Sequence, residues 1–196
     1  MPFFDKPKPP KPRKQSRRLR RDEYGRPTLT LPGYLPDAFV LAASDQAAVM
    51  VHGFACHPEG FAFQLEVTKR HEPPPGPDPE PEPFGIWHPH AEPGARFGIG
   101  YSDGRRATLE RTRSPGRYDD PGAQLGIMQS GGQGGSGHWR SELWVQPLPP
   151  PGPVTFAVEW PDAGIEETLH AIDGQLFQDA AARAQSAFPA RRRKKA

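Results

Sequence analysis

The chain has 196 residues, which suffices for one domain with extended ends. Its single cysteine excludes an intrachain disulfide framework, and its longest apolar stretch, residues 38–56, is interrupted by Asp45, Gln46 and His52, so it does not predict a membrane span. The N-terminus carries charge without an apolar core and is therefore no secretory signal, so we expect a soluble cytoplasmic protein with no membrane partner.

The charge of +2 hides a strong asymmetry. Residues 1–27 contain ten basic and three acidic residues, and residues 191–196 contain five basic ones, which leaves ten basic and twenty acidic residues in 28–190. The proline and lysine pattern of residues 1–27 predicts a disordered tail. The two tails either bind a polyanion such as nucleic acid or serve only as solubilising ends. In the first case the contacts come from Arg17, Arg18, Arg20, Arg21, Arg191, Arg192, Arg193, Lys194 and Lys195.

The body, residues 28–190, contains short runs of apolar, aromatic and β-branched residues separated by turn formers. In residues 61–67 Phe, Phe, Leu and Val alternate with small or polar residues, which is typical of a half-buried antiparallel strand. Asp103-Gly104 between two apolar runs predicts a hairpin. Such runs predict strands over residues 47–56, 61–67, 96–101, 107–110, 124–129, 139–145, 154–160 and 165–172.

The glycine run at residues 131–137 predicts a flexible loop, because it lacks the residues of a Walker loop and of an esterase elbow. After the last strand, Asp173 is a candidate N-cap for a helix over about residues 174–186, with an apolar stripe of Leu176, Ala180 and Ala184. The fold class that follows is all-β: an antiparallel β-sandwich, Ig-like or jelly-roll-like, with one C-terminal helix and disordered basic tails.

Metal-ligating residue types occur in two clusters, His52-x3-Cys56-His57 and His88-Pro89-His90. A continuous strand would place His52 and Cys56 on one face, so zinc would need a further ligand from His88 or His90. A small metal-dependent enzyme or metal-binding sandwich using His52, Cys56, His88 and His90 is therefore one alternative function. The simpler interpretation, a buried cysteine and surface histidines, implies no cofactor.

Trp144 falls on the strand face opposite Trp139, together with Arg140. If the ring is exposed, Trp144 and Arg140 form a partner contact, and Trp87 or Trp144 would offer a carbohydrate-binding platform. The competing expectation is that Trp144 packs under the C-terminal helix.

Residues 134–161, with the run His138-Trp139-Arg140-Ser141-Glu142-Leu143-Trp144-Val145 and the proline-rich turn that follows, resemble a segment of an actinobacterial family with no transferable activity. The resemblance extends from about His52 to Ala184 and implies a bacterial cytoplasmic setting. Because no catalytic constellation is evident, we expect a non-enzymatic module that binds a macromolecule, either a protein partner through the body or nucleic acid through the tails. The sequence leaves the oligomeric state open.

Overall fold

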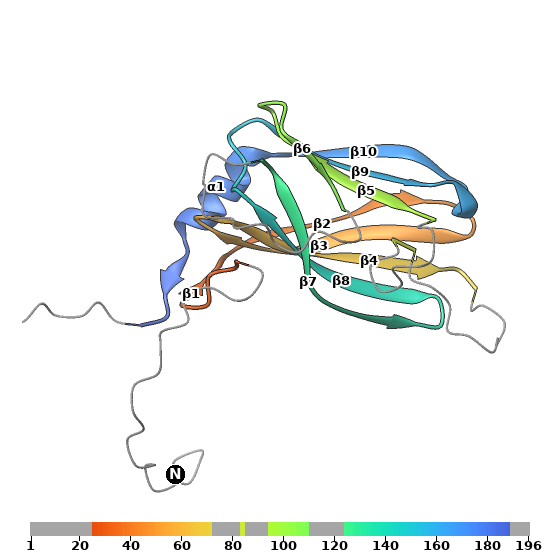
Figure 1. Ribbon diagram of the computed structural model, residues 1–196, viewed down its shortest axis with the longest axis horizontal. Helices are drawn as coiled ribbons and strands as arrows, with labels where there is room; N and C mark the ends of the chain where they lie inside the picture. The colour runs from red at the N-terminus through yellow and green to blue at the C-terminus, as the bar shows by residue number, and fades with distance from the viewer. Residues whose placement is uncertain (1–24, 72–82, 85–93, 110–123, 189–196) are drawn as a thin grey trace, which may run out of the picture.

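The computed structural model describes residues 25–71, 83–84, 94–109 and 124–188. Two antiparallel sheets lie face to face (Figure 1), which confirms the predicted all-β sandwich with one helix. The five-stranded sheet has the order β2 (Gly33–Ala43), β3 (Ala47–His57), β4 (Gly60–Lys69), β8 (His138–Gln146) and β7 (Gly126–Gly135). The four-stranded sheet has the order β10 (Ile165–Asp173), β9 (Pro153–Trp160), β5 (Arg96–Gly100) and β6 (Arg106–Thr108).

The core between the sheets follows from the period-two pattern of the strands. Phe61, Phe63, Leu65 and Val67 of β4 all point into it, as the alternation predicts. Aromatic rings from both sheets and from the helix meet there, since Phe54 contacts Phe63, Phe156 and Phe177 at centroid distances of 5.8, 5.8 and 5.4 Å. These edge and offset contacts favour a well-defined core.

The predicted hairpin is present between β5 and β6. Gly104 has a φ of +89°, a conformation that glycine adopts without a steric penalty, and the Asp103 carboxylate accepts hydrogen bonds from Arg105. The pairing Ile99 with Ala107 sets the register. Strand β6 of this hairpin is one edge of the four-stranded sheet as the described residues form it.

The prediction of a flexible loop over residues 131–137 is wrong for most of that range. Strand β7 continues to Gly135, and only Ser136 and Gly137, both with positive φ, make the turn into β8. The glycines pair in register with β8, for example Gly132 with Ser141 and Gly134 with Trp139. Residues 131–135 therefore form a strand because their backbone is hydrogen-bonded to β8, although glycine-rich sequence does not favour a strand.

Strands β8 and β9, although adjacent in sequence, belong to different sheets. The proline-rich block between them therefore carries the chain from one layer of the sandwich to the other. The sequence analysis also missed two strands near the N-terminus, β1 (Thr30–Leu31) and β2, and the short β11 (Gln185–Ser186).

A short 3-10 helix, η1 (Pro161–Ala163), leads into β10, and α1 (Gly174–Ala182) follows it with Asp173 as the predicted N-cap. The Asp173 carboxylate accepts a 3.0 Å hydrogen bond from the Gln175 amide. Of the predicted apolar stripe Ala180 is buried but Leu176 is exposed, and the buried face of α1 consists of Phe177, Ala180 and Ala181. The helix ends at Ala182, short of the predicted residue 186, because residues 185–186 pair with β1 instead. Among the described residues no helix is long and apolar enough to cross a membrane.

Candidate functional site

The two ends of the described body are joined by a two-stranded ribbon. Strand β1 pairs with β11, Thr30 opposite Ser186 and Leu31 opposite Gln185, and the Ala187 amide donates a 2.9 Å hydrogen bond to the Leu29 carbonyl. Gly25 and Phe188 are the residues to which the basic tails attach. Chain length from this ribbon limits the distance between their Cα atoms to about 25 Å. The fold thus brings together the attachment points of segments that lie at opposite ends of the sequence.

The segment that precedes the ribbon crosses the outer face of the five-stranded sheet. Arg26 forms a 2.6 Å ion pair with Glu142 on β8, and Gly25 lies beside the Gln146 side chain on the same strand. Trp144 stands between these two β8 residues on the same face and donates a 3.1 Å hydrogen bond from Nε1 to Gln146. Residues 25–26 therefore contact the two β8 residues that flank the tryptophan on this face.

The expectation of an exposed Trp144 ring is wrong, because the side chain is fully buried. It packs with Ala62 and Met128 on the outer face of the sheet, whereas α1 contacts β2, β3 and β10. Neither the partner platform nor the packing under the helix holds for this residue, because its ring is buried against Ala62, Met128 and the His57 ring, whose centroid lies 5.7 Å away. Trp87, the other candidate for a carbohydrate platform, lies outside the described residues.

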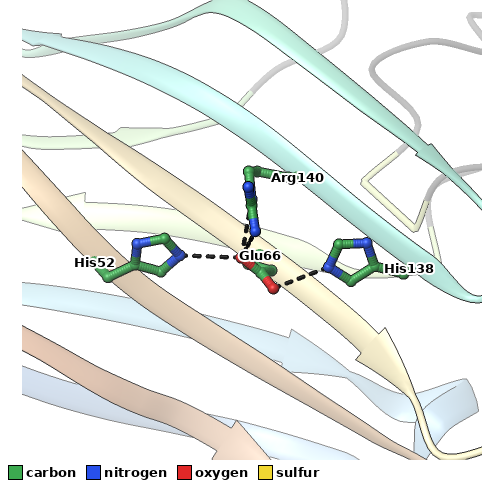
Figure 2. Close-up of polar contacts among 4 residues, drawn as sticks. All are labelled: His52, Glu66, His138 and Arg140. Atoms are coloured by element: carbon green, nitrogen blue, oxygen red, sulfur yellow. Dashed lines mark hydrogen bonds and ion pairs between the residues drawn. The ribbon is translucent and has the colours of Figure 1, made fainter.

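The same outer face carries a cluster of charged and titratable side chains centred on Glu66 of β4 (Figure 2). The Glu66 carboxylate contacts His52 Nε2 at 3.0 Å from β3 and His138 Nε2 at 2.9 Å from β8. Arg140, also on β8, donates to Glu66 Oε2 from Nε at 3.0 Å and approaches it with Nη2 at 2.9 Å. We call His52, Glu66, His138 and Arg140 the Glu66 cluster.

Three strands, β3, β4 and β8, supply the residues of this cluster. The Glu66 side chain is only 15% exposed, and burial alone would raise its pKa. The hydrogen bonds from His138, His52 and Arg140, together with the positive charge of Arg140, outweigh burial and lower the pKa of Glu66 to about 2. Glu66 is thus ionised near neutral pH and joins β3, β4 and β8, and a carboxylate with so low a pKa is poorly suited to general acid or base catalysis there.

The predicted metal ligands do not converge among the described residues. The register of β3 and β4 shifts between His52 and Ala55, around Gly53, whose φ is +71°. This bulge reverses the alternation, so Cys56 points into the core while His52 points outward to Glu66. The expectation that His52 and Cys56 share a face is therefore wrong.

Cys56 also has the wrong chemistry for an open site. Burial raises the pKa of its thiol to about 12, although the charge of Arg183 opposes the shift. Over the described part of the chain, no group of three or more His, Cys, Asp and Glu side chains could hold a metal ion. His88 and His90 lie outside the described residues, so the metal hypothesis stays a prediction as far as they are concerned.

The outer face of the four-stranded sheet is hollowed. A hollow of about 500 Å³ lies over Gly98, Gly100 and Ala157, with Leu169 on one wall and the Arg96–Glu159 ion pair at 3.1 Å on its rim. The glycines and the alanine leave this space because flanking strands carry the larger side chains. Its lining includes the hydroxyls of Thr108 and Thr155 and the carboxylates of Glu159 and Glu167.

Sequence reasoning missed Glu66 and His138. The sequence holds a weak signal for them, because polar residues alternate with apolar ones on both strands. The outward positions carry Gln64 and Glu66 on β4, and His138, Arg140 and Glu142 on β8. The pairing of β4 with β8, which places Glu66 opposite Arg140, joins segments about seventy residues apart and carries no local signal.

Comparisons with known proteins give no family assignment: no family model, no curated protein and no solved structure matches the chain. The resemblance to an actinobacterial family stays an expectation from the sequence.

Proposed function

We propose that this protein is a non-enzymatic interaction module whose two basic tails act together to tether it to nucleic acid or another polyanion. The observation that carries the proposal is the β1–β11 ribbon, which brings the attachment points of both tails to one end of the sandwich. Two weak electrostatic segments attached side by side bind one polymer more tightly than either alone, since the second contact becomes intramolecular.

The charge distribution supports the same proposal. Residues 28–190 carry ten more acidic than basic residues, so the body repels a polyanion and leaves the contact to the tails. In this arrangement a sheet face or edge of the body remains available to a protein partner.

The two alternatives have less support. A metal-dependent site needs His52 and Cys56 together, and they point to opposite faces of the sheet. A carbohydrate platform on Trp144 needs an exposed ring, and this ring is fully buried.

The test is the salt dependence of binding to a labelled DNA duplex, with the full chain throughout. One variant replaces Arg17, Arg18, Arg20 and Arg21 by serine, a second replaces the basic residues of 191–195, and a third combines both. The slope of log Kobs against log[salt] is negative, and loss of each block is expected to reduce its magnitude by about four. The combined variant is expected to bind most weakly. Arg106→Ser, on the body, is the control and should leave the slope within about one unit.

Cooperation between the tails makes a sharper prediction. Loss of either block should weaken binding by well over tenfold, because the intramolecular advantage disappears with it. Equal affinity of the combined variant and the unaltered chain would overturn the proposal.

A further inference from the structure

The end of the sandwich that carries the tails also exposes apolar side chains. Six large apolar side chains of the described residues are prominently exposed, and three of them lie here: Leu31 on β1 at 54%, Tyr34 at the start of β2 at 60%, and Phe188 after β11 at 63%. Single exposed apolar residues are ordinary on protein surfaces. Leu31 and Tyr34 are three residues apart, and Phe188 follows the strand that pairs with β1, so all three belong to the end of the sandwich to which the two basic tails attach.

The ribbon and the helix end place these side chains. Leu31 pairs with Gln185, and Phe188 follows three residues later, where its backbone and the Ser186 hydroxyl exchange hydrogen bonds of 2.8 and 3.3 Å. Tyr34 follows Leu31 by three residues, and its carbonyl accepts a 2.8 Å hydrogen bond from Nη2 of the exposed Arg183. We call Leu31, Tyr34, Arg183 and Phe188 the aromatic strip.

Arg183 contributes a guanidinium group to the strip. Its guanidinium donates to two backbone carbonyls, those of Tyr34 and Asp179 at 2.8 and 3.0 Å. A carbonyl is a neutral acceptor, so neither of these two hydrogen bonds neutralises the guanidinium. The strip therefore combines two aromatic rings, one aliphatic side chain and a cation, beside tails that contribute many more cations.

We propose that the aromatic strip is a base-stacking platform for single-stranded nucleic acid, with Tyr34 and Phe188 as the stacking residues. The inference rests on the proposed function, since the tails supply the phosphate contacts. Single-strand binding proteins combine a cationic track with aromatic side chains on which unpaired bases stack. A duplex keeps its bases inside the helix, so the strip adds affinity for a single strand and none for a duplex.

Charge complementarity would also attract the tails to an anionic membrane surface. The strip favours nucleic acid because two of its three apolar side chains are rings, and the strip lacks the long apolar helix face with which peripheral proteins insert into the interface. Membrane binding is therefore an outcome that would overturn the inference.

The test compares the full chain with Tyr34→Ala and Phe188→Ala, using a fluorescent oligothymidylate, a duplex of the same length and heparin. Each substitution is expected to weaken binding of the single strand roughly tenfold and to leave duplex and heparin binding within about twofold. Tyr34→Trp retains a ring and should retain the affinity. The matched control is Val40→Ala, because Val40 lies on the same strand and is 58% exposed.

The outcomes separate this inference from the proposed function. Equal single-strand binding by Tyr34→Ala, Phe188→Ala and the unaltered chain would overturn the platform and leave the tether standing. Binding that is unaffected by the tail variants would overturn the tether itself. Binding to phosphatidylserine vesicles that falls with Tyr34→Ala and Phe188→Ala, while single-strand binding does not, would assign the strip to a membrane surface instead.

Discussion

The Glu66 cluster and the aromatic strip both place an arginine near the surface, and they use it in opposite ways. Arg140 directs Nε and Nη2 to a carboxylate, so its charge is compensated within the fold. Arg183 donates to the backbone carbonyls of Tyr34 and Asp179, which carry no formal charge. The charge that a surface arginine offers to a partner thus depends on the chemistry of its internal acceptors as well as on its exposure.

The largest expected effect is a loss of stability at the end of the sandwich that carries the strip. A Cβ on Gly33 would lie 1.7 Å from the Ala180 carbonyl oxygen, so the start of β2 and the end of α1 approach too closely for a side chain. We expect Gly33→Ala to lower the free energy of unfolding by about 4 kcal/mol, measured by urea denaturation. Gly100→Ala, whose nearest contact would be Arg106 at an ordinary 3.6 Å, should change it by less than about 1 kcal/mol. Equal stability of the two variants would contradict the close approach.

A second, smaller effect concerns the cluster. The pKa of Glu66 is lowered from 4.5 to about 2 in the folded protein. Its ionised carboxylate therefore stabilises the fold at pH values above 4.5, and this contribution is lost as the pH falls toward about 2. We expect Glu66→Gln to cost about 2 kcal/mol near neutral pH, after allowance for solvent screening of its partners. The difference from the unaltered chain should shrink as the pH falls from 4.5 to about 2 in urea titrations. A difference that does not vary with pH would show that the ion contacts contribute nothing.

Substitution of Arg140 and of Arg183 should affect stability and polyanion binding differently. Arg140→Ala should lower the free energy of unfolding by about 1 kcal/mol and leave polyanion affinity unchanged, because its charge is already compensated. Arg183→Ala should weaken polyanion binding about two- to threefold through loss of one contact. Fluorescence anisotropy with the same single strand, at one salt concentration, measures the affinity of both variants, and urea denaturation measures the stability of Arg140→Ala. The reverse order of effects would mean that the cluster, and not the strip, faces the ligand.

The smallest expected signal is the reactivity of Cys56. Because burial raises the pKa of the thiol to about 12, a disulfide reagent at mildly alkaline pH should label it in the unfolded protein and not in the native one. Rapid labelling of the native protein would show that Cys56 is accessible and would revive it as a ligand or nucleophile.

Local sequence predicted most strands because their signal is local. The alternation over 61–67, the Asp103-Gly104 turn and the Asp173 cap each depend on neighbouring residues, and each is present in the structure. The candidate site was less predictable. Tyr34 and Phe188 were not singled out, because an exposed ring and a buried ring look the same in a sequence that gives no partner strand.

The sequence by itself determined that the body is built of antiparallel strands and that its charge is acidic between basic tails, because periodicity and charge are properties of the chain. Tertiary structure alone decided three other features. Pairing with β8 made a strand of the glycine run, a bulge at Gly53 turned Cys56 and His52 to opposite faces, and the β1–β11 ribbon brought the ends of the body together. Each depends on hydrogen bonds with, or a register relative to, a strand elsewhere in the fold, and such partners cannot be identified from neighbouring residues.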